Sequence, residues 1–336
     1  MNRLALAVLA STLLAAPAVA GAAYSERDEA QAFVRDMAQR HGFDSAELHA
    51  ALDRAQHDER VIRLITPPAT PAARSWQRYR AGFLDTPRLE GGLAFWRQHE
   101  AALTAAHERF GVPSEIVVAI IGVETLYGRN TGKFETVSAL ATLAFDYPPR
   151  APLFLRELEN LFLLAREQGR DPFSYQGSYA GALGYPQFLP SSIRSYAIDF
   201  DGNGRTELAA EPVDAIGSIA NYMAVHGWQR DAPVAMRARM EPATDPAPLV
   251  QAGIEPTLTP ELLTLAGIAP LRGPAHDAPA TLVDLATPDA DTEYWLGYRN
   301  FYVITRYNKS SFYAMAVFEL ARALRERREA SPPGSP

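Results

Sequence analysis

The sequence predicts a mainly helical protein of the α+β class, and three stretches carry that prediction. Residues 116–128, IVVAIIGVETLYG, begin with an almost unbroken apolar run, which is typical of a helix buried on all sides. Residues 137–144 and 153–166 read as two further helices. Residues 231–291 differ, because prolines are frequent and aromatic residues are absent. Short β-prone pieces at 234–240 and 281–285 predict a small β-rich insertion there.

These stretches divide the chain into a series of expected parts. The parts are a signal peptide at 1–20, a helical N-terminal domain at 21–110, a helical core with a calcium-type loop at 111–230, a β-rich insertion at 231–293, a return to the core at 294–328 and a disordered tail at 329–336.

Composition excludes several classes of protein. The chain has 336 residues, 47% of them hydrophobic and 21% charged, as in a soluble globular protein of two or three domains. The net charge of -7 gives no indication of a nucleic-acid partner. There is no cysteine, so disulfides, thiolate metal sites, cysteine catalysis and lipid attachment through an N-terminal cysteine are excluded.

The N-terminus has the pattern of a secretory signal. Arg3 supplies the positive start, residues 4–16 are apolar, and Ala18-Val19-Ala20 fits a cleavage site. A membrane anchor is the alternative, but this apolar run is short for spanning a bilayer, and no later segment reaches transmembrane length. We therefore expect a soluble exported protein, periplasmic in a Gram-negative cell.

The N-terminal part, residues 24–60, reads as helical and polar. His41, His49 and His57 recur every eight residues, a spacing that favours a solvated helix face over a metal site. A proline-rich linker at 67–71 follows, and then aromatic residues at helical spacing. Most of these aromatics are expected in the core, and Tyr79 is a candidate for the wall of a groove.

Glu124 is the one acidic residue in the apolar helix of residues 116–128, and it stands at the end of that helix. Burial disfavours a carboxylate, and so does the negative end of a helix dipole. Both effects keep the side chain protonated near neutral pH, as a general acid requires. The alternative is a buried glutamate with a structural role, satisfied by hydrogen bonds.

A glycine-rich loop, residues 176–187, follows with the sequence QGSYAGALGYPQ. Its glycines allow close approach of backbone to a ligand, and Ser178 and Gln187 offer hydrogen-bonding groups. A purely structural loop is the alternative. The loop matches neither a phosphate-binding loop nor the G-x-S-x-G elbow of serine hydrolases.

Residues 199–204, DFDGNG, match the first half of a calcium-binding loop. The match then fails, because position twelve is Ala210 rather than a glutamate. Asp214, four residues later, is a candidate for the missing carboxylate. The alternative is a turn rich in aspartate and asparagine without a metal.

Taken together, the placed motifs resemble the lytic murein transglycosylase B family, whose catalytic glutamate lies in a lysozyme-like core. The resemblance extends over residues 76–319. It is carried by GVETLYG at 122–128, SALATLAFDYP at 138–148, GSYAGALGYPQFLPSS at 177–192, DFDGNG at 199–204, PVDAIGSIANYMAVHGW at 212–228 and NFYVITRYNKSSFYAMAV at 300–317.

The resemblance implies a role for particular residues. The catalytic acid of the family falls on Glu124. The groove residues implied are Ser178, Gln187, Tyr222, Tyr307, Asn308 and Tyr313, and the calcium ligands implied are Asp199, Asp201, Asn203, the carbonyl of Arg205 and Asp214. The spacing to Asp214 is one residue shorter than in the family. Pro186 replaces a glycine of relatives, and Leu153 replaces a groove tyrosine.

The activity implied is cleavage of the β-1,4 bond between N-acetylmuramic acid and N-acetylglucosamine in peptidoglycan, with formation of a 1,6-anhydro ring by a single glutamate. No organic cofactor is implied, and we expect a monomer acting on glycan strands. A hydrolytic muramidase is the nearest alternative, since Glu135 or Asp146 could supply a second acid. A non-enzymatic peptidoglycan-binding protein and a structural calcium-binding protein also remain open.

Overall fold

The computed structural model describes residues 23–68, 73–274 and 276–330. The predicted signal peptide, four residues of the linker region and the last six residues of the predicted tail lie outside this range. The chain forms two compact units that divide between Ala55 and Gln56, whereas the first predicted domain boundary after the signal lay at residue 110. The division falls earlier because the helices of residues 76–110 pack on the central helices of the second unit.

The described part of the first unit, from residue 23 onwards, contains two α-helices, α1 (Asp28–His41) and α2 (Ser45–Arg54), which contact each other. The first ends at Gly42, whose φ of 64° is left-handed, as expected for a helix-terminating glycine. The second begins at Asp44, whose carboxylate accepts hydrogen bonds from two backbone N–H groups of the first turn. Apolar side chains such as Met37 and Leu52 are completely buried in this unit.

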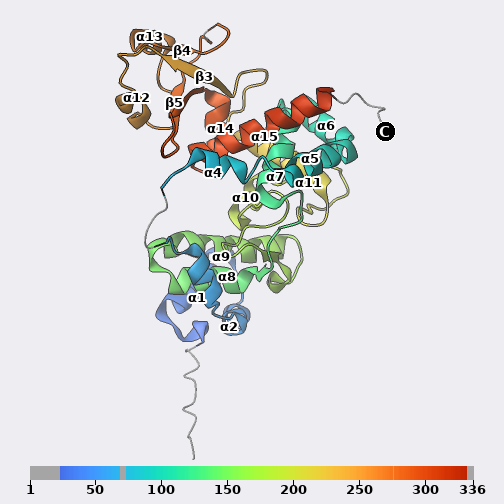
Figure 1. The fold of residues 1–336 in the computed structure, drawn as a ribbon. Coiled ribbons are helices and arrows are strands. Elements are labelled where there is room, and N and C mark those ends of the chain that lie inside the picture. The colour runs from blue at the N-terminus through green and yellow to red at the C-terminus, as the bar shows by residue number, and fades with distance from the viewer. Residues whose placement is uncertain (1–22, 69–72, 275, 331–336) are drawn as a thin grey trace, which may run out of the picture. The chain divides into compact units, whose positions relative to one another are not determined.

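The second unit is mainly helical, which confirms the predicted fold class (Figure 1). Its described α-helices are α3 (Glu59–Ile65), α4 (Trp76–Ala81), α5 (Thr86–Gln98), α6 (Glu100–Phe110), α7 (Ser114–Thr125), α8 (Thr136–Asp146), α9 (Ala151–Glu167), α10 (Pro190–Tyr196), α11 (Pro212–Val225), α12 (Ala247–Gln251), α13 (Pro260–Leu265), α14 (Arg299–Tyr307) and α15 (Ser311–Ala330). Among the described residues, no helix is both long and apolar enough to cross a bilayer.

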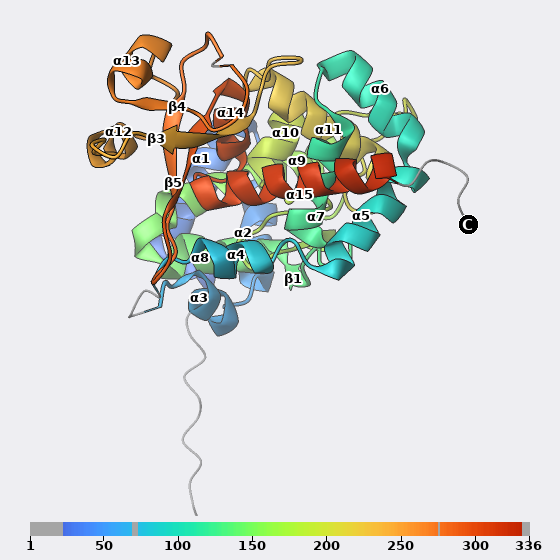
Figure 2. The same cartoon turned by 45° about the horizontal axis from the view of Figure 1, so that its top comes forward.

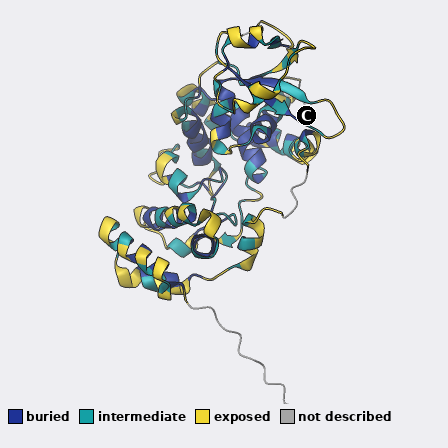
Figure 3. Ribbon diagram, turned by 90° about the vertical axis from the view of Figure 1, so that its left-hand side faces the viewer, coloured by how far each residue is buried: buried dark blue, intermediate teal, exposed yellow. Residues whose placement is uncertain are grey.

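The predicted central helix, α7, is buried on all sides. Every residue from Ile116 to Val123 is buried, and α7 contacts α5, α6, α11 and α15. Figure 2 shows α15 running beside α7. Buried residues concentrate in the packed helices, and exposed residues follow their outer faces (Figure 3). A continuous apolar helix is stable here because neighbouring helices remove it from water on every side.

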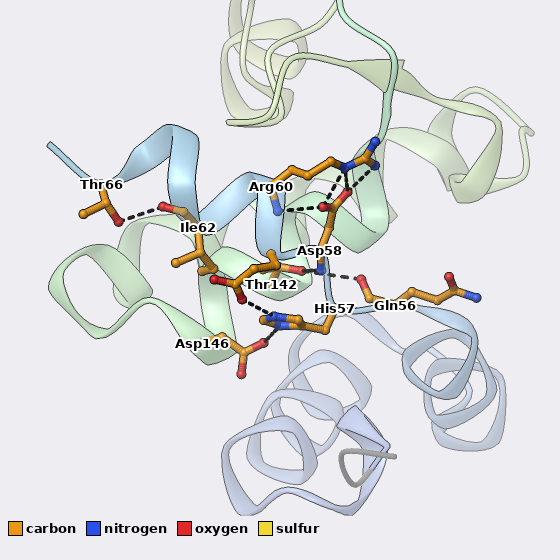
Figure 4. Close-up of polar contacts among 9 residues, drawn as sticks. Gln56, His57, Asp58, Arg60, Ile62, Thr66, Thr142 and Asp146 are labelled. Carbon is orange, nitrogen blue, oxygen red and sulfur yellow. Dashed lines mark hydrogen bonds and ion pairs between the residues drawn. The ribbon is translucent and has the colours of Figure 1, made fainter. Parts of the chain in front are cut away.

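The segment that enters the second unit is fixed to α8 by polar contacts (Figure 4). The backbone N–H of Asp58 donates to the hydroxyl of Thr142, and His57 Nδ1 lies 2.7 Å from a carboxylate oxygen of Asp146. Asp58 also caps α3 by accepting from the backbone N–H of Arg60. These contacts anchor α3 against α8.

The predicted β-rich insertion forms an antiparallel sheet in the order β4-β3-β6-β5. The strands are β3 (Ala235–Met240), β4 (Ile268–Pro270), β5 (Thr281–Leu285) and β6 (Glu293–Gly297). The sheet therefore continues past residue 293, the predicted end of the insertion, because β6 pairs with both β3 and β5. A separate small cluster of buried side chains, including Leu282 and Leu296, supports it.

A second, two-stranded sheet joins β1 (Phe134–Glu135) to β2 (Gln176–Gly177). Its close approach depends on glycine, because a Cβ on Gly132 would lie 2.0 Å from the backbone of Gly177. This pairing holds the start of the glycine-rich loop beside α8, which β1 contacts.

Candidate active site

Glu124 occupies the last turn of α7, as the sequence predicts. The helix ends because Leu126 and Tyr127 adopt left-handed backbone conformations, with φ of 51° and 60°. Residues other than glycine rarely adopt this conformation, and it is often maintained at functional sites. The turn directs the chain away from the helix axis immediately after Glu124.

The surroundings of Glu124 favour its neutral form. Burial raises the pKa of its carboxyl to about 7, although the hydrogen bond from Tyr313 acts in the opposite direction. The hydroxyl of Tyr313 donates to Oε1 of Glu124 over 2.6 Å. A carboxyl with a pKa near neutrality can donate a proton and accept one in the same reaction cycle.

Aromatic rings gather beside this carboxyl. The rings of Tyr307 and Tyr313 stack with centroids 6.4 Å apart and planes 12° apart. Tyr222 meets Tyr307 edge-on at 5.0 Å, and Phe188 lies within 5.7 Å of both of these rings. The charge of Glu124 contributes to the raised pKa values of Tyr307 and Tyr313, after burial as the larger cause.

Helix α14 and the start of α15 position these tyrosines. Tyr307 is the last residue of α14, and its hydroxyl donates to the carbonyl of Pro186 over 2.6 Å. Tyr313 lies in the first turn of α15, which packs along α7. Asn308, between the two helices, is exposed. The structure therefore brings Tyr307 and Tyr313 to Glu124, and places Asn308 at the surface next to them in sequence.

Tyr79 lies on α4 and packs against Trp76 and Phe312 with ring centroids 6.3 and 5.6 Å apart. Burial raises the pKa of its hydroxyl, and the charge of Glu124 raises it further. Because Phe312 directly precedes Tyr313, which donates to Glu124, these ring contacts bring Tyr79 next to the site from a helix distant in sequence from α7 and α14.

Two residues of the 122–128 motif, which the sequence did not single out, maintain the turn after Glu124. The hydroxyl of Thr125 accepts from the backbone N–H of Gly128 and lies 3.4 Å from the carbonyl of Tyr185. The hydroxyl of Tyr127 donates to the carbonyl of Arg88 over 2.7 Å. The sequence offered one indication of their importance, since both residues belong to the GVETLYG motif that the chain shares with the family.

The motif glycines make room for these aromatic rings. A Cβ on Gly122 would lie 2.4 Å from the hydroxyl oxygen of Tyr127, and a Cβ on Gly128 would lie 2.3 Å from the ring of Tyr185. Gly128 also has a φ of 83°. Either substitution would displace a ring that holds the turn.

The glycine-rich loop uses its polar side chains to set its own shape. The hydroxyl of Ser178 accepts from the backbone N–H groups of Ala180 and Ala182. The side-chain amide of Gln187 donates to the carbonyls of Thr131 and Gly184, and its φ of 49° is left-handed. Hydrogen bonds within the protein therefore hold the side chains of Ser178 and Gln187 in place.

Tyr222 lies on α11, and its hydroxyl donates to the carbonyl of Arg306 over 2.7 Å. Its ring stacks on His226 at 4.0 Å and contacts Tyr307. Because the hydroxyl is engaged with backbone, Tyr222 presents mainly its ring to the aromatic cluster. Leu153, at the start of α9, is partly buried.

The two acids that could have supplied a second catalytic carboxylate are engaged elsewhere. Glu135 accepts a hydrogen bond from the hydroxyl of Ser138 over 2.7 Å. Asp146 faces His57 (Figure 4). Neither is among the groups that shift the pKa of Glu124.

The predicted calcium loop brings three carboxylates together. Asp199, Asp201 and Asp214 each offer an oxygen, and these oxygens lie within 4.8 Å of one another. The side-chain oxygen of Asn203 accepts from the backbone N–H of Arg205 over 2.9 Å, so that both residues form part of the same turn. Such an all-oxygen donor set suits a hard cation such as Ca²⁺.

Asp214 is completely buried and ties the loop to α11. Its two oxygens accept from the backbone N–H groups of Phe200 and Glu207, each over 2.8 Å. The backbone N–H groups of Gly202 and Gly204 donate to Asp199. The loop is therefore shaped by hydrogen bonds that leave lone pairs on the carboxylate oxygens.

Sequence comparison identifies relatives over most of the chain. The family model described as the transglycosylase SLT domain matches residues 25–322. The membrane-bound lytic murein transglycosylase B of Escherichia coli strain K12 is 42% identical over 315 residues, which cover 90% of this chain and 84% of that protein.

Solved structures agree with this assignment. Catenated SltB1 of Pseudomonas aeruginosa has a TM-score of 0.85 at 41% identity, covering 90% of this chain and 99% of that chain. The Escherichia coli lytic transglycosylase Slt35 in complex with calcium has a TM-score of 0.81 at 42% identity, covering 90% and 95%. SltB3 of P. aeruginosa, in complex with NAG-anhNAM-pentapeptide, has a TM-score of 0.78 at 28% identity, covering 91% and 80%. The chain therefore belongs to the lytic murein transglycosylase B family and is a lytic transglycosylase.

Proposed function

We propose that this enzyme cleaves the β-1,4 bond between N-acetylmuramic acid and N-acetylglucosamine in peptidoglycan and leaves a 1,6-anhydro ring on the muramic acid. The observation that carries the proposal is the partly buried carboxyl of Glu124, whose pKa is about 7 and which lies among tyrosines. The relatives support the substrate, since one is named for murein and SltB3 was solved with NAG-anhNAM-pentapeptide.

Glu124 serves in both halves of the reaction. The protonated carboxyl donates its proton to the glycosidic oxygen, the bond from that oxygen to C1 breaks, and positive charge develops at C1. The resulting carboxylate then takes the proton of the C6 hydroxyl, whose oxygen bonds to C1 and closes the anhydro ring. Glu124 is protonated again, and no water is consumed.

The alternative is a hydrolytic muramidase. Glycosidases that use water usually place a second carboxylate about 5–9.5 Å from the acid. Glu135 and Asp146, the two acids considered for that role, are engaged with Ser138 and His57. This arrangement favours a single-acid mechanism.

The aromatic cluster suits a sugar ligand. Rings such as those of Tyr79 and Tyr313 offer flat faces on which the apolar faces of pyranose rings can lie. Ser178, Gln187 and Asn308 supply hydrogen-bonding groups for hydroxyl and N-acetyl substituents. In this assignment Tyr222 acts by supporting Tyr307.

A calcium ion is the proposed occupant of the 199–214 loop. The ligands are Asp199, Asp201, Asn203, the carbonyl of Arg205 and Asp214, of which the three carboxylates already converge. The related Slt35 was solved in complex with calcium. The ion stabilises the connection between the loop and α11, and takes no part in bond cleavage.

Export to the periplasm and action as a monomer complete the proposal. The A-x-A pattern at residues 18–20 supports export, although it lies outside the described residues. Cell fractionation and N-terminal sequencing of the secreted chain test this directly: a chain that still begins with Met1 would contradict processing.

The Glu124→Gln variant tests the acid. It keeps the shape of the side chain and removes the proton, so we expect release of soluble fragments from purified sacculi to fall by about 10²–10⁴-fold. Glu135→Gln and Asp146→Asn serve as controls that keep activity within a few-fold. Mass spectrometry of the products of the unaltered enzyme decides between the two reactions, since the anhydro product lacks one water. Products ending in reducing muramic acid would establish a hydrolase.

A further inference from the structure

Arg88, in the first turn of α5, contacts the chain on both sides of Glu124. Its guanidinium Nε donates to the carbonyl of Gly122, which precedes Glu124 in α7, over 3.3 Å. Its backbone carbonyl accepts from the hydroxyl of Tyr127, which follows Glu124, over 2.7 Å. A single residue of a neighbouring helix therefore holds both ends of the turn that carries the proposed acid.

The guanidinium of Arg88 is itself held in place. Its Nη1 donates to one carboxylate oxygen of Asp85 over 2.9 Å, and the other oxygen accepts from the backbone N–H of Arg88 over 2.9 Å, which caps α5. The ring of Phe83 lies 5.1 Å from the guanidinium carbon. The side chain is 18% exposed, so these contacts are largely shielded from water. A guanidinium with so little remaining freedom can fix the carbonyl to which it donates.

The turn after Glu124 depends on contacts from outside it. Leu126 and Tyr127 both have positive φ, a conformation that persists in residues other than glycine only where the surroundings impose it. The carbonyl of Gly122, near the end of α7, accepts from the backbone N–H of Leu126 over 3.2 Å as well as from Arg88. A cation at the C-terminal end of a helix is also favourable. The guanidinium thus stabilises the helical turn in which Glu124 lies.

Glycines of α5 hold the other end of this turn by leaving room for the ring of Tyr127. A Cβ on Gly91 would lie 2.9 Å from that ring, and a Cβ on Gly92 would lie 2.5 Å from its hydroxyl oxygen. The ring therefore packs directly against the backbone of α5 and keeps this position without its hydroxyl. Any group added at Gly91 would displace it.

We propose that Arg88 is a positioning residue for the reaction, whose contact with Gly122 fixes the last turn of α7 and keeps the carboxyl of Glu124 beside Tyr313. This inference rests on the proposed role of Glu124 as the acid. The carboxyl must lie within hydrogen-bond reach of the glycosidic oxygen, and a misplacement of about 1 Å costs about 10²-fold in rate. Arg88 acts through the backbone and transfers no proton.

The Arg88→Met variant removes the donor and keeps an unbranched side chain. We expect kcat on soluble glycan strands to fall by about tenfold or more, with little change in KM, because the groove residues stay in place. The pKa of Glu124 should fall as well, because a displaced carboxyl loses part of the burial that raises this pKa to about 7. Arg88 is not among the groups that shift the pKa of Glu124, so a change reports a displaced carboxyl rather than a lost charge.

Two measurements report this pKa. The alkaline limb of the pH–activity profile should move downward in Arg88→Met. A ¹³C NMR titration of the glutamate carboxyls, with the signal of Glu124 assigned by its absence in Glu124→Gln, should move in the same direction and requires no turnover.

Matched variants separate positioning from general stability. Arg88→Lys keeps a cationic donor and should recover most of kcat and of the pKa of Glu124. Arg97→Met, at an exposed position of the same helix, should change neither. Gly91→Ala tests the other end of the turn, and should lower both as Arg88→Met does. Because alanine favours a helix more than glycine, that loss would come from the displaced ring of Tyr127.

The outcomes distinguish this proposal from the assignment of the acid. An Arg88→Met enzyme that melts earlier but keeps its kcat and the pKa of Glu124 would overturn the positioning role, since Arg88 would then serve stability alone. If Arg88→Met does not fold, unchanged kcat and pKa in Gly91→Ala overturn it equally. Activity retained in Glu124→Gln would instead refute the acid, and an inactive Glu124→Gln with an unmoved pKa in Arg88→Met would refute the positioning role alone.

Discussion

Two carboxyl groups of this enzyme, the partly buried Glu124 and the fully buried Asp214, lie at opposite ends of their helices. Glu124 is in the last turn of α7 and has one hydrogen-bond donor, the hydroxyl of Tyr313. Asp214 is in the first turn of α11 and accepts from two backbone N–H groups. The helix dipole favours negative charge at the start of a helix and disfavours it at the end. Thus the same functional group has one hydroxyl donor in one place and two backbone donors in the other, which suits the proposed roles of proton donor and calcium ligand.

Exchanging each carboxyl for its amide should separate these roles most strongly. Asp214→Asn replaces a buried acceptor by a donor that faces backbone N–H groups, which should lower the free energy of unfolding by several kcal/mol, at about 1–3 kcal/mol for each unsatisfied group. Glu124→Gln should leave the melting temperature equal or higher at pH 7. Thermal unfolding of the two variants measures the difference, and Asp277→Asn, at an exposed position outside the calcium loop, serves as control. Equal losses in both variants would contradict the comparison.

The free energy of unfolding should depend on pH through the titration of Glu124. Its pKa is raised from 4.5 to about 7 in the folded chain, so folding favours the protonated form. The associated stability is fully present below pH 4.5 and is lost as the pH rises to about 7. The loss is of order 3 kcal/mol, at 1.36 kcal/mol for each pKa unit.

Denaturant unfolding between pH 4 and 8 measures this loss. The Glu124→Gln variant should lack this component, so the difference in unfolding free energy between the two proteins should grow with pH and level off above about pH 7. Parallel curves over the whole range would show that Glu124 titrates normally.

Stabilisation by calcium should require the carboxylate of Asp214 and should not require that of Glu124. If the loop binds Ca²⁺, saturation at 100 times the dissociation constant stabilises the fold by about 2.7 kcal/mol. A chelator should therefore lower the melting temperature of the unaltered enzyme and of Glu124→Gln alike, and should have no effect on Asp214→Asn. Unchanged melting of all three proteins would exclude a stabilising ion.

The smallest expected effect concerns the single donor on Glu124. Tyr313→Phe keeps the ring and removes the hydrogen bond that lowers the pKa of Glu124, so that pKa should rise. The alkaline limb of the pH–activity profile should move upward by up to about one unit. Tyr127→Phe removes a hydroxyl that donates to Arg88 instead, and should reduce stability without moving the limb. A limb displaced downward would contradict the direction of the hydrogen bond.

Much of the fold was predictable because local patterns dominate there. The apolar run of residues 116–123 can be stable only as a buried helix, and the structure has it as α7. Residues 234–240 and 281–285 were predicted as β-prone pieces, and the structure has them as β3 and β5, whereas β4 was not predicted. The sheet could not be bounded from sequence, since β6 is aromatic-rich and its pairing with β3 and β5 is a long-range property.

The contacts of the site were less accessible to sequence reasoning. Tyr313 and Glu124 are separated by 189 positions and meet only because α15 packs along α7. Asp146 was open as a second acid until its contact with His57 placed it elsewhere. No sequence motif predicts that the indole N–H groups of Trp76 and Trp295 are buried without an acceptor among the described residues, because this depends on which atoms surround them in the folded chain.

The sequence by itself determined the central apolar helix, the acid at its end, the acidic loop of residues 199–204 and the family, because each depends on residues adjacent in the chain or on motifs in fixed order. The tertiary structure alone decided the hydrogen-bond partners of Glu124 and of Asp214. Those properties depend on burial and on donors brought from distant segments, and chain folding sets both.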